Sequence, residues 1–290
     1  MLGNARATAL TSWHNHGFIP ELRLGDRVAL IAWKKAPLSP KAVIVNFCDL
    51  TMRAALRGSR IRKLKRELRE SETLILSTVG PDELLDHLSI ERLHDTALRL
   101  DVDWVITPDD YVYEADGRYP FYQDSHFSRS ILRALQLLRM AKGHYGIIGL
   151  AIGSSLNQLQ EFVTTMEEYE VNNFAFACGD VLKQGRRFKR TTLEIGGFIK
   201  SLKASKHNSL LLGIDSPHLL RILDPDNWAS SAWSIDASHW RYYARDGTRR
   251  KGYRIVCDHD VCRSGELKGM ELFGVHNLLA DRDLLLEGRN

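Results

Sequence analysis

Four side chains near the C-terminus could together hold a metal ion. They are Cys257, His259, Cys262 and His276, in a C-x-H-x₂-C-x₁₃-H arrangement. Two thiolates and two imidazoles can form a tetrahedral Zn²⁺ site, and four protein ligands leave no open position for a catalytic water. We therefore predict a structural zinc ion, with residues 266–279 forming a helix that brings His276 to the other ligands. The alternative is a set of unrelated cysteines and surface histidines.

A second group of reactive side chains is acidic and follows short apolar runs. Asp109 and Asp110 stand together in TPDDYVYEADGRYPFY, Asp236 stands in SIDASHWRYYARDG, and Asp49 follows an earlier run. Carboxylates in such places often cap the next helix. Asp109, Asp110 and Asp236 instead lead into aromatic segments, so we interpret them as candidate site residues.

The elements that must position these acids are short strands that alternate with helices. Residues 156–169, for example, place six apolar side chains at helical spacing. The predicted strands are Val28–Trp33, Ala42–Phe47, Thr73–Leu76, Trp104–Ile106, Tyr145–Ile152, Phe174–Cys178, Leu210–Ile214 and Ala232–Ile235. This alternation predicts an α/β fold with a parallel sheet. Eight units fit a closed (β/α)₈ barrel of the TIM type, whose active site lies at the carboxyl ends of the strands. An open doubly wound sheet is the alternative.

The motifs resemble those of the tRNA-guanine transglycosylase superfamily, from roughly Ala42 to the C-terminus. The zinc segment is similar to the family's C-x-C-x₂-C followed by a His-Asn-Leu helix, with His259 in place of the middle cysteine and Val275-His276-Asn277-Leu278 at the end. SIDASHW is similar to the family's nucleophile segment, Phe-Asp-Ser-Ala-Ser-Tyr. DWVITPDDY resembles its base-recognition segment, Asp-Ile-(apolar)-Asp-Glu-Cys.

The resemblance implies a role for each matching residue. Asp236 becomes the covalent nucleophile and Asp109 the group that recognises the base. The family's third-strand Asp-Ser-Gly-Gly is matched by Ser77-Thr78-Val79-Gly80, without an acid, so Asp49 on the neighbouring strand is the candidate general acid or base. Gly149-Leu150-Ala151 and Ala177-Cys178 replace two further glycine motifs. The other predicted substrate-binding residues are Asp110, Ser77, Gly149, Cys178 and Gly179.

The resemblance also implies an activity and a domain arrangement. We expect a barrel over residues 1–246 and a zinc-binding segment with a C-terminal helix over 247–290. The short chain and loosened motifs look more like the DNA-guanine transglycosylase branch, which exchanges guanine in DNA for a free 7-deazaguanine base of the preQ0 type. The alternatives are an enzyme that acts on tRNA and a non-catalytic nucleic-acid-binding subunit. A homodimer or a partner protein is left open.

The charge distribution favours a nucleic-acid partner more than the total charge does. The chain has 40 basic and 36 acidic residues, a net charge of +4. Local clusters of cations suit phosphate contacts. One cluster spans residues 57–69, where a solvated helix face explains it equally well. The cations predicted to bind nucleic acid are Lys183, Arg186, Arg187, Lys189, Arg190, Arg245, Arg249 and Arg250.

The lengths of the apolar runs in the sequence indicate where the protein is expected to be located. None approaches the roughly 20 residues that a membrane helix needs, and the N-terminal sequence has no apolar run of signal-peptide length. We therefore expect a cytoplasmic protein of a bacterium or a phage-infected host, without a membrane partner.

Overall fold

The structure is a computed structural model that describes the strands and helices of the chain and a smaller part of its C-terminal region. The described residues are 17–22, 27–38, 42–47, 58–68, 70–79, 85–110, 123–153, 155–177, 188–213, 217–229, 259–264, 266, 274–275, 278–279 and 282–283.

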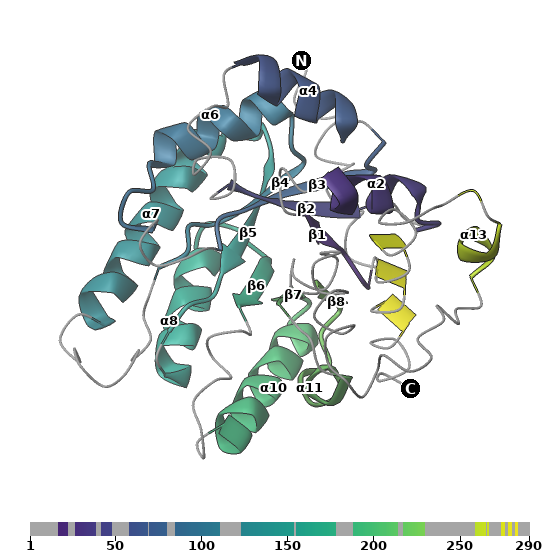
Figure 1. The fold of residues 1–290 in the computed structure, drawn as a ribbon. Helices are drawn as coiled ribbons and strands as arrows, with labels where there is room; N and C mark the ends of the chain where they lie inside the picture. The colour runs from purple at the N-terminus through teal and green to yellow at the C-terminus, as the bar shows by residue number, and fades with distance from the viewer. Residues whose placement is uncertain are drawn as a thin grey trace.

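Eight parallel strands form one curled sheet, in the same order in space as in the sequence (Figure 1). The strands are β1 (Glu21–Leu22), β2 (Ala42–Asn46), β3 (Thr73–Ser77), β4 (Trp104–Ile106), β5 (Gly146–Leu150), β6 (Asn173–Ala177), β7 (Asn208–Leu212) and β8 (Asn227–Trp228). The helices are α2 (Arg27–Lys35), α4 (Gly58–Glu67), α6 (Ile90–Leu100), α7 (Gln123–Ala141), α8 (Leu156–Glu167), α10 (Phe188–Ala204), α11 (Pro217–Leu223) and α13 (Asp260–Arg263). The predicted α/β fold with eight parallel strands is confirmed.

The segment that leads into β1 is hydrogen-bonded to the last strand. Phe18 and Trp228 form a parallel bridge. The Ile19 amide donates to the Trp228 carbonyl at 2.8 Å, and the Trp228 amide donates to the Gly17 carbonyl at 2.8 Å. A doubly wound sheet reverses its strand order, whereas this sheet runs in sequence order and its two ends meet. The architecture is therefore consistent with a TIM-like barrel.

The first predicted strand does not correspond to an observed one, and the last is not tested by the described residues. Val28–Trp33 was predicted as a strand but lies in α2, where Ala32 and Trp33 are buried. The first observed strand is β1, which precedes α2. Its two residues are too few to give a recognisable sequence pattern. The chain reaches β8 at Asn227–Trp228, and the predicted strand Ala232–Ile235 lies outside the described residues. The six predicted strands between them are confirmed, with ends shifted by two residues or fewer.

The helices from α2 to α11 lie outside the curled sheet, and α13 lies apart from it (Figure 1). In α8 the buried residues are Leu159, Phe162, Val163 and Met166, which confirms the predicted apolar stripe. The strands are buried on both sides, as all five residues of β3 illustrate. The main core therefore lies within and around the sheet.

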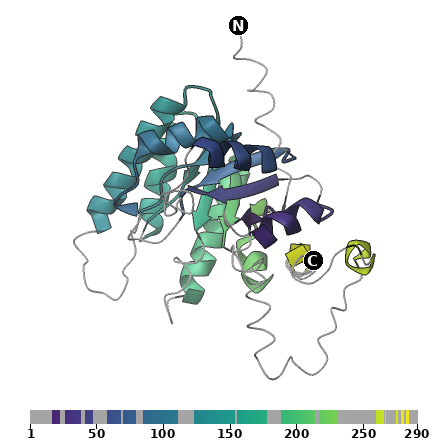
Figure 2. The same cartoon turned by 45° about the horizontal axis from the view of Figure 1, so that its top comes forward.

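The C-terminal segment lies beside α2 in two views (Figure 1 and Figure 2). Its buried residues Val275, Leu278 and Leu279 belong to the same core as the barrel strands. Residues 274–275 and 278–279, the described parts of the predicted helix 266–279 after Glu266, are helical. This part of the chain is therefore packed on the barrel.

Two adjacent glycines in α10 test the packing of that helix on α11. A Cβ added at Gly196 would lie 2.7 Å from the carbonyl oxygen of Ile222, whereas one added at Gly197 would meet open space. We expect Gly196→Ala to lower the free energy of unfolding by about 1–3 kcal/mol through overpacking. Gly197→Ala should raise it by about 0.5–1 kcal/mol, because alanine is the better helix former. Urea denaturation of both variants checks this, and equal effects would contradict the α10–α11 contact.

Candidate active site

The chain beyond β4 stays buried as it crosses the carboxyl end of the sheet. Residues 107–110 are all buried, directly after the strand. The Thr107 amide donates to the Ile148 carbonyl at 2.9 Å, and its hydroxyl accepts from the Leu150 amide at 2.7 Å. These bonds extend the β4–β5 pairing past the end of β4. The segment that carries the two aspartates is thus fixed to its neighbouring strand.

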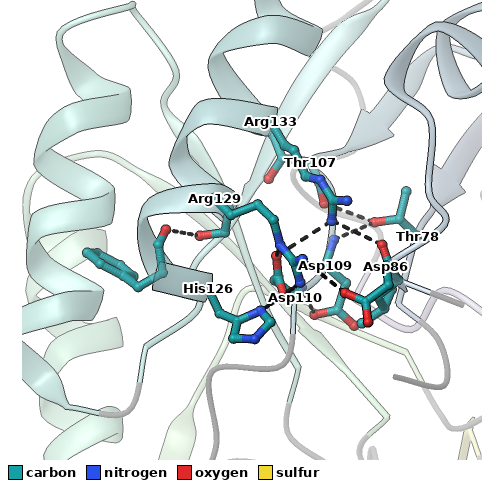
Figure 3. Close-up of polar contacts among 11 residues, drawn as sticks. Thr78, Asp86, Thr107, Asp109, Asp110, His126, Arg129 and Arg133 are labelled. Atoms are coloured by element: carbon teal, nitrogen blue, oxygen red, sulfur yellow. Dashed lines mark hydrogen bonds and ion pairs between the residues drawn. The ribbon is translucent and has the colours of Figure 1, made fainter. Parts of the chain in front are cut away.

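Thr78, just after β3, ties the same segment from the other side. Its hydroxyl donates to the Thr107 carbonyl at 3.0 Å and accepts from the Asp109 amide at 3.0 Å (Figure 3). Both Thr78 and Thr107 are fully buried. A buried hydroxyl that both donates and accepts satisfies two backbone groups at once. The ends of β3, β4 and β5 therefore form one hydrogen-bonded unit.

Two hydrogen bonds hold Asp109 at this strand end, one to its backbone amide and one to its side chain. Its residue is 4% exposed, and its carboxylate oxygen Oδ1 accepts a hydrogen bond from the Asp110 amide at 2.9 Å. With its own amide bonded to Thr78, both its backbone and its side chain are oriented. The structure thus gives Asp109 a defined position among the residues at the carboxyl ends of the strands.

Asp110 is completely buried and is surrounded by two arginines and a histidine (Figure 3). Arg129 approaches it with two nitrogens, Nε at 2.6 Å from Oδ2 and Nη2 at 2.6 Å from Oδ1. His126 Nδ1 lies 2.8 Å from Oδ1, and Arg133 Nη1 lies 3.5 Å from Oδ2. Bidentate pairing of guanidinium and carboxylate is strong and directional. Both oxygens of Asp110 are therefore engaged within the protein, which favours a role in positioning Asp109.

The three side-chain partners of Asp110 come from one face of α7. His126, Arg129 and Arg133 are spaced i, i+3 and i+7, which aligns their side chains. Arg129 Nη1 also contacts Asp86 Oδ1 at 2.9 Å, and Arg133 Nη1 donates to the Leu85 carbonyl at 3.1 Å. Sequence analysis did not identify these residues. The spacing His-x₂-Arg-x₃-Arg, at the start of a helix that follows two aspartates, was the available indication.

Two other predicted substrate-binding residues lie on the strands that flank Asp109. Ser77 ends β3 with 1% exposure, and its hydroxyl accepts from the Val79 amide at 3.2 Å. Gly149 lies in β5, where an added Cβ would sit 3.1 Å from Phe174 and 3.3 Å from Phe162 of α8. That direction leads into the layer between sheet and helices. Ser77 directly precedes Thr78, whose hydroxyl bonds the Asp109 amide. Gly149 is explained by close packing, because a side chain there would crowd two phenylalanines.

Most of the other predicted site residues cannot be placed. The positions outside the described residues are Asp49, Asp236, Cys178, Gly179, Cys257, His276, Lys183, Arg186, Arg187, Arg245, Arg249 and Arg250. Lys189 and Arg190 lie in α10, and Cys262 lies in α13, but only their backbones are described. Their proposed roles stay predictions.

His259 is the one predicted zinc ligand whose side chain is described. It precedes α13 as its N-terminal cap residue, and its Nε2 lies 2.6 Å from Oδ2 of Asp283. Arg282 contacts the other oxygen of Asp283 at 2.7 Å. Among the side chains that the structure describes, no three metal-binding groups meet at one point. The contact between His259 and Asp283 connects the first part of the predicted zinc segment to a residue that follows its last predicted ligand, His276.

Comparisons with known proteins leave the chain without an assigned family. No protein-family model matches it, and no curated protein matches it significantly. Over the described residues, no helix combines the length and apolar character needed to cross a membrane.

Asp110 with its partners His126, Arg129 and Arg133 forms the Asp110 cluster, and Arg129 also contacts Asp86. The cluster predicts that substitutions at Asp110 and Asp86 change the free energy of unfolding by different amounts. Asp110 is completely buried, while the Asp86 side chain is 45% exposed. Asp110→Asn should lower the free energy of unfolding by about 3 kcal/mol, because it leaves two partly buried arginines without their buried counter-charge. Asp86→Asn should cost less than about 1 kcal/mol, as exposed ion pairs do. Chemical denaturation of both variants measures the difference, and similar losses would show that Asp110 is not the centre of the cluster.

Proposed function

We propose that this protein is a base-exchanging transglycosylase that replaces guanine in DNA with a 7-deazaguanine. The observation that carries the proposal is the position of Asp109, an oriented and nearly buried carboxylate at the carboxyl end of β4. In TIM-like barrels this edge of the sheet is where active sites are built. The motif resemblance to transglycosylases supplies the reaction class.

A carboxylate in this position suits the recognition of guanine. Guanine presents an N1–H and a 2-amino group side by side, and a carboxylate has two oxygens with about four acceptor positions. The bond from the Asp110 amide to Oδ1 uses one of these positions. Replacing N7 by carbon does not alter the N1 and 2-amino edge. The same carboxylate could therefore bind the departing guanine and the incoming deazaguanine.

The Asp110 cluster supports such recognition by fixing the donor that orients Asp109. The Asp110 side chain is held by Arg129 and His126, so its amide, which donates to Asp109 Oδ1, is held as well. Preorganised groups stabilise charge without having to rearrange during the reaction. We propose that His126, Arg129 and Arg133 are positioning residues for Asp109.

The proposed reaction is a double displacement at C1′ of the target nucleotide. Asp236 attacks C1′ while the C1′–N9 bond breaks, and the bonding electron pair leaves with guanine, which takes up a proton. The deprotonated N9 of the incoming deazaguanine then attacks C1′ from the face that guanine left, opposite the C1′–carboxylate bond, and that bond breaks to release the carboxylate. Two displacements retain the configuration, as in retaining glycosidases. Asp49 is the proposed group that transfers the protons. The target nucleotide must leave the base stack for C1′ to be reached.

The proposal predicts the effects of two substitutions on guanine release. Asp236→Ala should abolish exchange, a loss of at least about 1000-fold, because it removes the covalent nucleophile. Asp109→Asn should slow exchange by at least about tenfold, because an amide offers one acceptor oxygen where the carboxylate offers two. The assay follows radiolabelled guanine released from DNA and from tRNA, together with an adduct that resists denaturation.

The matched control is Asp95→Asn on α6, an exposed acid remote from the strand ends. It should release guanine at the wild-type rate. Equal release by wild type and Asp236→Ala would exclude Asp236 as the nucleophile. Release from tRNA alone would make the protein an RNA-directed enzyme. Binding without release from either substrate would favour a non-catalytic subunit.

We further propose that residues 247–290 hold a structural zinc ion through Cys257, His259, Cys262 and His276. The donor set has the chemistry that zinc prefers, and metal-bound histidines usually contact a carboxylate through their second nitrogen. The contact from His259 to Asp283 supports this arrangement. The ion would stabilise this segment and take no part in the reaction.

The zinc proposal predicts one zinc ion per chain and a C-terminal region that depends on it. Chelation should expose this region to proteolysis, because a site that does not preform couples metal binding to folding. Elemental analysis and limited proteolysis measure both effects, with Cys48→Ser, outside the proposed ligand set, as the control. Less than about 0.2 zinc per chain, with no effect of chelator, would contradict the site.

A further inference from the structure

The basic helix α4 forms a surface that the proposed reaction does not use. Residues 57–69 contain seven basic residues and one acidic residue, although the whole chain carries a net charge of only +4. The rest of the chain therefore has a small net negative charge. This basic segment includes helix α4, which spans Gly58–Glu67.

Helix α4 separates its apolar and basic side chains cleanly. Ile61 is buried, and the half-buried Leu64 packs against the core. Leu68, directly after the helix, is also buried. The four described cations, Arg62, Lys63, Lys65 and Arg66, are all exposed. The helix is thus fixed to the barrel by one face and presents the other to solvent.

Two of these cations have carboxylate partners and two do not. Lys63 lies 3.8 Å from Glu67, and Lys65 lies 3.1 Å from Asp101. Arg62 and Arg66 make no ion pair or hydrogen bond with the side chains that the structure describes. Both line an open hollow of about 490 Å³, together with Lys65, Ser71, Glu72 and Asp103. Three acids, Glu72, Asp101 and Asp103, also line this hollow; Asp101 pairs with Lys65, and Asp103 accepts from the Leu74 amide at 2.8 Å.

The hollow lies at the opposite edge of the sheet from Asp109. Its residues Ser71 and Glu72 precede β3, and Asp101 and Asp103 precede β4. Thr78 and Asp109 follow the same two strands. A five-residue strand such as β3 spans roughly 16 Å. A phosphate group bound on α4 would therefore lie at the other end of the strands from the proposed catalytic groups.

We propose that the exposed face of α4 binds the sugar-phosphate backbone of a nucleic acid, through Arg62 and Arg66 and with Lys65 beside them. Arg66 follows Arg62 by four positions, which places the two residues about 6 Å apart along the helix axis. Phosphates follow one strand of a duplex every 3.4 Å of its axis, so this separation suits about two nucleotides. Arginine guanidinium groups are also well matched to phosphate oxygens.

A membrane surface fits this face less well than a nucleic acid. Basic helices that bind membranes insert large apolar side chains beside their cations. The exposed large apolar residues that the structure describes are Leu98, Leu132, Leu156, Tyr169 and Leu193, none of which lies on α4. The apolar side of α4 is already covered by the barrel. Its free side offers charge alone, as phosphate-backbone contacts require.

The test compares the double variant Arg62→Gln/Arg66→Gln with a control of equal charge, Arg139→Gln/Arg221→Gln. Arg139 and Arg221 are exposed residues of α7 and α11. Fluorescence anisotropy of labelled 20-base-pair DNA and of tRNA gives the binding constant at several salt concentrations. Each lost phosphate contact should reduce the slope of log K against log salt by about 0.9 for duplex DNA. The α4 variant should lose nearly 2 in slope and at least about tenfold in affinity at 0.1 M salt.

The binding assay does not depend on transglycosylation, so its failure and the failure of the proposed reaction can be told apart. The control should bind like wild type, and both variants should keep the wild-type unfolding midpoint. Unchanged binding by the α4 variant would overturn the proposal, as would an equal loss in the control. Binding to vesicles that contain phosphatidylserine, lost in the α4 variant while DNA and tRNA do not bind at all, would assign the surface to membranes and also overturn it.

Discussion

Asp110 brings a full negative charge into a place without solvent, and the surrounding structure is arranged to neutralise it. Removing a carboxylate from water costs several kcal/mol unless charged partners and hydrogen bonds replace the lost hydration. Arg129 supplies two short contacts, and His126 and Arg133 complete the set. This requirement fixes the start of α7 against the end of β4. It also joins α7 to the segment before α6, through Asp86 and Leu85.

The neighbouring aspartate has a different environment, although the two residues are adjacent. The Asp109 amide donates to the Thr78 hydroxyl, and its Oδ1 accepts from the Asp110 amide, so both of these contacts are with neutral groups. One aspartate thus has its charge balanced by arginines, while the other is aligned by hydrogen bonds. This division is reasonable for a site in which one acid supports the structure and the other meets a ligand.

The sequence was most informative where periodicity was strong and least informative where contacts were distant. The strands β2 to β7 could be predicted because buried parallel strands are short continuous apolar runs. The apolar run in α2 satisfied the same criterion, and only tertiary packing made it a helix. Asp109 could be singled out from its position after β4. The role of Asp110 could not, because it depends on His126 and Arg129, whose spacing indicates a helix face without indicating what that face meets.

The bridge between Phe18 and Trp228 has a consequence for how the chain folds during synthesis. The Gly17 amide also donates to the Asn227 side chain, across 210 residues of sequence. At roughly 5–20 residues per second, about 10–40 s pass on the ribosome between the synthesis of the two partners. During that time the segment before β1 lacks its strand neighbour, and unpaired strand edges readily pair with other chains. The sheet can therefore close only after the last of its eight strands has been synthesised.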